Sequence, residues 1–134
     1  MNKQIVIDAA QGTLGRIASY ASKQALLGKT IAIVNCNEVL IAGKREATLK
    51  EYKKKRARGG SSLNGPNFPK HPERIMKRTI RGMLSYKQGR GSSALDKIKC
   101  YNTIPSEFES SEKISLKREI KVKAITLKEL SKIL

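Results

Sequence analysis

The sequence predicts an α/β protein with a small parallel β-sheet core that is flanked by helices and carries a basic helical and loop extension. Two features support this fold class: β-branched runs at residues 4–8 and 30–35 enclose an amphipathic helical stretch, and most of the positive charge falls between residues 44 and 90. The chain has 134 residues. Because typical domains have about 100–150 residues, we expect a single domain over residues 1–134.

The first third of the chain has the pattern of a strand, a helix and a second strand. Thr13, a residue type favoured at helix N-caps, precedes apolar residues at helical spacing: Leu14, Ile17, Ala18, Ala21 and Ala25. Gly28 is expected to end this helix, and the strand that follows is apolar nearly throughout, as in strands covered on both faces. The short joints predict a right-handed crossover between two parallel strands. A second apolar run follows at residues 39–42.

Residues 44–90 hold 15 Lys and Arg residues against three Asp and Glu residues, so they carry +12 of the net charge of +17. We expect a basic helix with a thin apolar side over residues 44–58 and a loop over 59–69. A second helix opens at Pro72. Its predicted apolar stripe is Ile75, Met76, Thr79, Ile80 and Met83, and its predicted basic face is Arg74, Lys77, Arg78 and Arg81.

The last third of the chain is expected to add a strand and a terminal helix. A glycine-rich basic loop is predicted over residues 85–91, a short helical piece around Ala94 and Leu95, and a strand over residues 98–101. The tail alternates apolar and basic residues over 120–124, which is typical of a strand. Residues 126–129 match a capping box, so a short helix should begin there and dock on the body. The acidic cluster at residues 107–112 is interpreted as a solvated face.

Catalysis and metal binding find no support in the sequence. The single histidine, His71, has no paired carboxylates nearby for acid and base catalysis, and it cannot form a metal site with the distant Cys36 and Cys100. Both cysteines are interpreted as reduced, partly buried thiols. No apolar stretch approaches the roughly 18 residues of a membrane span. We therefore expect a cytoplasmic protein that is not an enzyme and has no cofactor, metal, small-molecule substrate or membrane partner.

Two short motifs imitate nucleotide-binding sites. Residues 28–30 look like the end of a P-loop, but Lys23 stands where the first glycine belongs. The triplet also leads from a helix into a strand, the reverse of a phosphate loop. Residues 8–15 lie between a strand and a helix but lack the glycine spacing of a dinucleotide-binding loop. We interpret them as a tight turn, with a phosphate at the helix N-terminus as the alternative.

The charge pattern of residues 44–90 indicates a surface that binds a nucleic acid. A basic run at residues 53–58 precedes Gly59 and Gly60, a helix with four cations on one side follows, and Lys87 and Arg90 lie in the glycine-rich loop. Arginine forks bind phosphate oxygens in pairs, and glycines allow a backbone to approach closely. Aromatic residues make up only 4% of the chain, with no Trp. Contacts to phosphates and to shape are therefore favoured over base stacking.

A family resemblance narrows the class of nucleic acid. Residues 81–91, followed by Ala94, Leu95 and residues 99–101, resemble the universal large-subunit ribosomal protein L-thirteen family. The resemblance is close and nearly full length, and its other carriers are residues 7–9, 14–19, 27–29, 34–36, 41–44 and 72–75. The basic block at 53–60 and the tail at 126–130 are similar to the archaeal and eukaryotic branch. Ser85 departs from a family proline, and Thr103 departs from a family glycine.

The resemblance implies a structural constituent of the large ribosomal subunit that supports subunit assembly and translation. Its implied partners are 23S-type rRNA and neighbouring large-subunit ribosomal proteins. It also implies that Met83 and Leu84 pack the helix end that presents the loop. The resemblance and the basic segment together predict an RNA-binding set of Arg16, Lys44, Arg45, Lys53, Lys54, Lys55, Arg56, Arg58, Gly59, Gly60, Arg74, Lys77, Arg78, Arg81, Lys87 and Arg90.

Two other classes of protein stay as rivals. The charge alone would suit a free DNA-binding or chromatin-compacting protein, but no helix-turn-helix, zinc finger or basic zipper can be placed on the sequence. A small nucleotide-dependent α/β enzyme would need the phosphate loop that the sequence lacks.

Overall fold

The sheet at the centre of the molecule is parallel, as the sequence predicts. The computed structural model describes residues 4–57, 71–116 and 123–133. Within them, four strands lie in the order β4, β2, β1, β5, and all neighbouring pairs are parallel. The strands are β1 (Gln4–Asp8), β2 (Thr30–Val34), β4 (Ile98–Cys100) and β5 (Lys113–Ser115). The predicted α/β class is confirmed.

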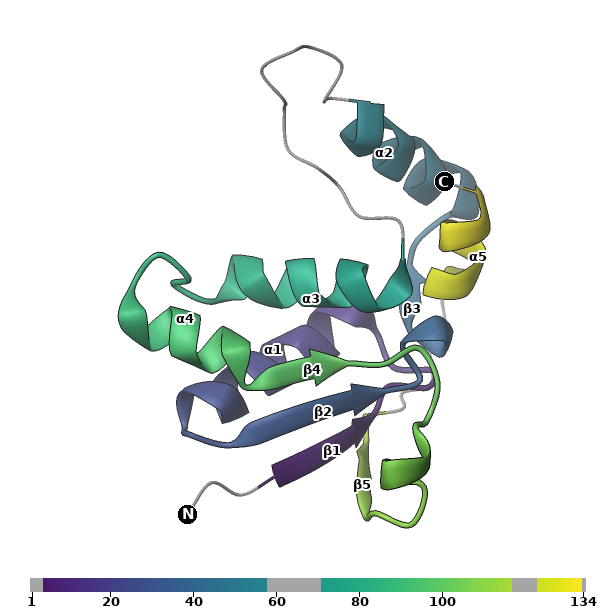
Figure 1. Ribbon diagram of the computed structural model, residues 1–134. Helices are drawn as coiled ribbons and strands as arrows, with labels where there is room; N and C mark the ends of the chain where they lie inside the picture. The colour runs from purple at the N-terminus through teal and green to yellow at the C-terminus, as the bar shows by residue number, and fades with distance from the viewer. Residues whose placement is uncertain (1–3, 58–70, 117–122, 134) are drawn as a thin grey trace.

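Helices cover one face of this sheet, and a short segment covers the other. The helices are α1 (Leu14–Leu26), α3 (Pro72–Met83) and α4 (Gly89–Asp96), which lie together on one side of the strands (Figure 1). Successive side chains of a strand point to opposite faces. Ile7 and Ile33 therefore enter the core shared with α1 and α3, whereas Val34 packs with Phe108 of the 3-10 turn η2 (Ser106–Phe108) on the other face.

The predicted strand, helix and strand unit is confirmed in detail. Thr13 occupies the N-cap of α1 with extended backbone angles, although its side chain makes no capping hydrogen bond. The five apolar residues predicted at helical spacing are all buried. Gly28 ends the helix with a φ of +96°, a left-handed conformation that glycine adopts without strain.

The turn between β1 and α1 is packed internally, which confirms the tight-turn interpretation. The Gly12 N–H donates to the carbonyl of Ala9 at 3.1 Å, and the carbonyl of Gly12 accepts from Leu40 at 2.8 Å. A Cβ at Gly12 would lie 2.7 Å from Cδ1 of Ile17, so a larger residue there would require the buried Ile17 side chain to shift. At the same edge of the sheet, the side-chain amide of Asn35 donates to Oδ1 of Asp8 at 2.9 Å.

A second, two-stranded sheet joins the middle of the chain to its tail. Strand β3 (Leu40–Ala42) pairs antiparallel with β6 (Ala124–Thr126). Helix α5 (Leu127–Ile133) follows β6, and the Glu129 N–H donates to Oγ1 of Thr126 at 3.2 Å. This bond is half of the predicted capping box. Leu127 and Leu130 are fully buried, so the prediction that the terminal helix docks on the body is confirmed.

Helix α2 (Arg45–Ala57) forms the predicted basic extension. Among its described side chains, the buried ones are Thr48 and Tyr52, one turn apart, with Leu49 partly buried beside them, so the apolar side is thin as expected. Figure 1 shows α2 on the opposite side of α3 from the central sheet. The loop predicted over 59–69 lies outside the described residues, and so do residues 120–122 of the predicted tail strand.

Two expectations about residues 83–91 are wrong. Met83 is 45% exposed, because the chain turns after α3 and Leu84, which is buried, fills the core in its place. The glycine-rich loop is shorter than predicted, because α4 already begins at Gly89. The acidic residues Glu107, Glu109 and Glu112 are exposed, in agreement with the solvated-face interpretation, and the strand β5 that follows them, which the sequence did not predict, pairs with β1 at the sheet edge.

The two cysteines are free thiols, as predicted. Cys36 is buried and Cys100 is half-buried. A hydrogen bond with the Cys100 thiol and burial both raise the pKa of Cys36 above its ordinary value. The Cys36 thiol therefore stays protonated, which suits a packing role rather than a reactive one.

Candidate nucleic-acid interface

Helix α3 presents part of the predicted basic face to solvent. Arg74 and Arg81 are exposed and lie two turns apart on one side of the helix. Arg78 lies between them and is half-buried, close enough to Tyr52 of α2 that its positive charge opposes the rise that burial causes in the tyrosine pKa. Arg78 thus connects α3 with the basic extension.

Helix α2 and the residue before it contribute four more exposed cations of the predicted set. Lys44, Arg45, Lys53 and Lys54 all face solvent. Lys55 and Arg56 belong to α2, but their side chains lie outside the described part of the structure. Arg58, Gly59 and Gly60 lie outside the described residues altogether. Exposed cations of the predicted set therefore lie at the start of the extension and again at Lys53 and Lys54, where its described side chains end.

The turn between α3 and α4 adds two exposed cations and holds a third in place. Lys87 and Arg90 are exposed, and Arg90 lies in the first turn of α4 rather than in a loop. The guanidinium of Arg81 lies over the ring of Tyr86, 5.2 Å from its centroid. This cation–π contact restrains Arg81 at the surface without neutralising its charge. Tyr86 is a contributor that the charge pattern did not reveal.

Gly91 has a different role from the one that the sequence suggested. A Cβ on Gly91 would lie 2.0 Å from the carbonyl oxygen of Ser85, so this glycine lets the turn approach α4. The close backbone approach at Gly91 is therefore between two parts of the protein itself, the turn at Ser85 and α4. Gly89, by contrast, is exposed and has no atom within 4 Å of such a Cβ.

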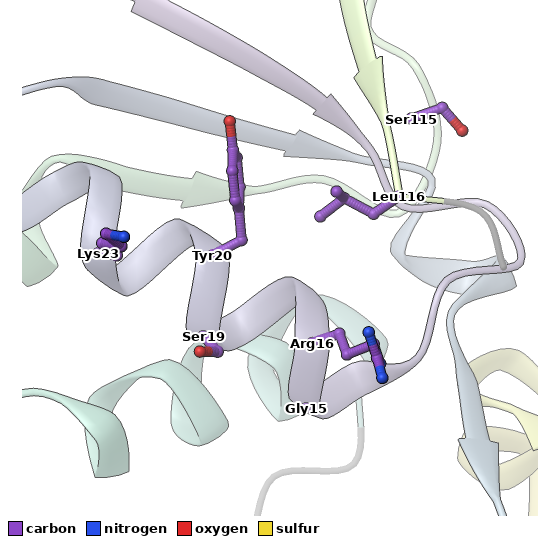
Figure 2. Close-up of a pocket in the computed structure, with 7 residues that line it drawn as sticks. All are labelled: Gly15, Arg16, Ser19, Tyr20, Lys23, Ser115 and Leu116. Atoms are coloured by element: carbon purple, nitrogen blue, oxygen red, sulfur yellow. The ribbon is translucent and has the colours of Figure 1, made fainter.

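Arg16 lies on a different helix from the rest of the predicted set. It is exposed on the outer side of α1, beside an open hollow of about 720 Å³ (Figure 2). The Leu116 side chain extends toward Tyr20 in this hollow, with Arg16 toward one end and Lys23 toward the other. Lys23 was not predicted as a functional residue, because it is an isolated basic residue in a helix and no local pattern marks it.

Lys77 was predicted to bind RNA, but its ammonium makes hydrogen bonds inside the protein. Its ammonium donates to the carbonyl of Leu95 at 2.6 Å and also to the carbonyl of Ile98. Leu95 lies in the last turn of α4, where free carbonyls and the helix dipole favour a cation. Burial lowers the pKa of Lys77 from its ordinary value. Lys77 therefore ties α3 to α4 and β4.

Replacing Lys77 is expected to destabilise the fold rather than to weaken nucleic-acid binding. Lys77→Met keeps the apolar stem but removes two charge-assisted hydrogen bonds, which should lower the free energy of unfolding by about 1–3 kcal/mol. Arg74→Met removes the same charge from an exposed position of the same helix and should leave stability nearly unchanged. Urea denaturation followed by circular dichroism compares the two variants. Equal stability of both proteins would contradict the structural role of Lys77.

Among the described residues, no group of side chains suits metal-dependent catalysis. No group of three or more His, Cys, Asp or Glu side chains among them is placed to hold a metal ion. His71 is exposed at the N-cap of α3. Among the described helices, none has the length and apolar character needed to cross a membrane.

Comparison with known proteins identifies the family. A family model described as ribosomal protein L13 matches residues 2–107 of the chain. The chain belongs to the ribosomal protein L13 family. Members of this family are structural proteins of the large ribosomal subunit and not enzymes, so the expected class of protein is confirmed.

Archaeal members of the family are similar over most of the chain. The large ribosomal subunit protein uL13 of Methanosarcina barkeri is 49% identical over 112 residues, which cover 83% of this chain and 79% of that protein. The protein of the same name from Archaeoglobus fulgidus is 41% identical and covers 96% of this chain and 86% of its own. That of Methanocaldococcus jannaschii is 42% identical, with 95% and 94% covered. The predicted similarity to the archaeal branch agrees with these relatives.

Proposed function

We propose that the chain binds 23S-type rRNA through the basic surface formed by α2, α3 and the turn into α4, and that this binding supports assembly of the large subunit. The observation that carries the proposal is a set of nine predicted cations that are exposed and, among the described residues, paired with no carboxylate. They are Arg16, Lys44, Arg45, Lys53, Lys54, Arg74, Arg81, Lys87 and Arg90.

The arrangement of these cations supports backbone contacts rather than reading of bases. Eight of the nine lie between residues 44 and 90, and they come from α2, α3, the first turn of α4, and the segments just before α2 and α4. Exposed cations spread over several elements can follow a folded phosphate backbone, whereas base readout needs side chains that reach into a groove or stack on bases. The one exposed aromatic residue of this surface that the structure describes, Tyr86, already stacks with Arg81.

A double substitution tests the surface. Arg74→Gln combined with Arg81→Gln should weaken binding of an rRNA fragment by about 15- to 30-fold near 0.15 M salt, because each lost phosphate contact lowers affinity about fourfold to fivefold there. Filter binding or fluorescence anisotropy with the full chain measures the change. Circular dichroism should remain that of the folded protein, since both side chains are exposed.

The matched control removes the same charge from a helix that is not part of the proposed surface. Lys128 and Lys132 are exposed on α5 and lie outside the proposed surface, so Lys128→Gln combined with Lys132→Gln should change affinity only slightly. Equal losses for the two pairs would mean that only net charge matters and would contradict a defined surface. Equal affinity for duplex DNA of the same length would favour a general DNA-binding protein instead.

A further inference from the structure

A groove between the C-terminal half of α1 and the junction of α3 with α4 is more apolar than the basic surface. Among the described residues, the exposed large apolar side chains are Leu26, Leu27, Met83, Tyr86 and Ile114. Three of them, Leu26, Leu27 and Met83, line one hollow of about 440 Å³. Leu27 is 65% exposed and Met83 is 45% exposed. Single exposed apolar residues are ordinary, but a cluster of them marks a binding surface.

Cations border this apolar cluster. Lys23 and Arg90 line the same hollow, together with Ser19. We call the surface made by Ser19, Lys23, Leu26, Leu27, Met83 and Arg90 the α1 groove. It is continuous with the hollow of Figure 2, because Ser19 and Lys23 line both. No described residue that lines either hollow is acidic.

We propose that the α1 groove receives an extended peptide segment of a neighbouring protein of the large subunit, with an apolar side chain over Leu26, Leu27 and Met83 and an acidic side chain facing Lys23, while Arg90 at the border of the groove stays with the rRNA-binding surface. From Ser19 to Leu27 the helix rises about 12 Å, enough for roughly four residues of extended chain. The inference relies on the proposed function only in placing the chain next to other proteins of that subunit.

The apolar cluster and the charges both favour an acidic peptide with an apolar side chain over a phosphate backbone or a second copy of this chain. A phosphate backbone would satisfy Lys23 and Arg90 but would leave two leucines and a methionine against a highly charged surface, where their apolar area gains nothing. Methionine is enriched at protein interfaces. A second copy of this chain would bring a net charge of +17 to a groove bordered by cations, so electrostatic repulsion opposes it.

Site-specific photocrosslinking in assembled large subunits tests the proposal. The full-length chain carries p-benzoylphenylalanine in place of Leu27, and adducts are separated into protein and RNA after irradiation. The expected result is a protein adduct whose crosslinked peptide holds an apolar residue within a few positions of Asp or Glu. An rRNA adduct, a crosslink to a second copy, a peptide without acidic residues, or no adduct would each overturn the proposal.

A charge reversal tests the electrostatic part with a matched control. In the Leu27 probe background, Lys23→Glu should reduce the yield of the protein adduct about tenfold, because it replaces attraction by repulsion of an acidic partner. Lys128→Glu makes the same charge change on α5 and should leave the yield unchanged. Equal yields for both variants would contradict pairing at Lys23.

The same probe at Arg74 separates this inference from the proposed function. Arg74 lies on the basic surface, so the probe there is expected to crosslink to rRNA. A protein adduct at Leu27 without an rRNA adduct at Arg74 would support the groove and contradict the rRNA surface. The opposite pattern would contradict the groove alone.

Discussion

Raising the salt concentration from 50 to 200 mM is expected to weaken binding of the chain to 23S-type rRNA by about 250-fold to 250,000-fold. The structure exposes nine cations of the predicted set, which is consistent with roughly 6–10 phosphate contacts. Each contact releases counterions from the RNA, so the logarithm of the association constant should fall with the logarithm of the salt concentration at a slope of about −4 to −9.

The slope, rather than a single affinity, is the quantity to measure. Titrations of one rRNA fragment at four or more salt concentrations determine it. Arg74→Met should make the slope shallower by about 0.7–0.9, because one phosphate contact is lost, whereas Lys77→Met should leave it unchanged. A slope near zero for the natural sequence would contradict the electrostatic account. A shallower slope for Lys77→Met would show that Lys77 contacts the RNA.

The elements that could be predicted from the sequence are those whose pattern is local. Residues 4–8, the helix that ends at Gly28 and the strand after it have clear periods and clear stops, and the structure places them as expected. The capping box at Thr126 is also a local signal. By contrast, β5 has three residues and no alternation that distinguishes it from the acidic tail, so its pairing with β1 depends on tertiary contact alone.

The role of a basic or apolar residue on α3 depends on tertiary contacts that the local sequence pattern does not reveal. Lys77 shares a helix face with Arg74, but Leu95 and Ile98, which come later in the chain, accept hydrogen bonds from its ammonium. Met83 fits the apolar period of α3, yet the helix ends there and Leu84 enters the core instead. A helical period predicts which side chains share one face of a helix. It does not predict whether that face packs against another element or contacts solvent.

Gly91→Ala is expected to lower the free energy of unfolding by about 3 kcal/mol. The new Cβ would lie 2.0 Å from the Ser85 carbonyl oxygen and 2.3 Å from its carbon, and backbone atoms cannot yield as a flexible side chain can. The same carbonyl accepts from the Gln88 N–H at 2.9 Å, and Leu84 just before it is buried in the core. Relief of the clash therefore requires the turn to move and Leu84 to lose packing.

The sign of this effect distinguishes packing from helix propensity. In an open helical position, glycine to alanine stabilises by up to about 1 kcal/mol. Gly89→Ala, two residues earlier and without close neighbours, should accordingly be neutral or slightly stabilising. Thermal unfolding measures both variants, and for a chain of this size 3 kcal/mol corresponds to a fall in Tm of about 10 °C. If Gly91→Ala were as stable as Gly89→Ala, the close approach of Ser85 to α4 would be wrong. A role for Gly91 in approaching rRNA would then have to be considered again.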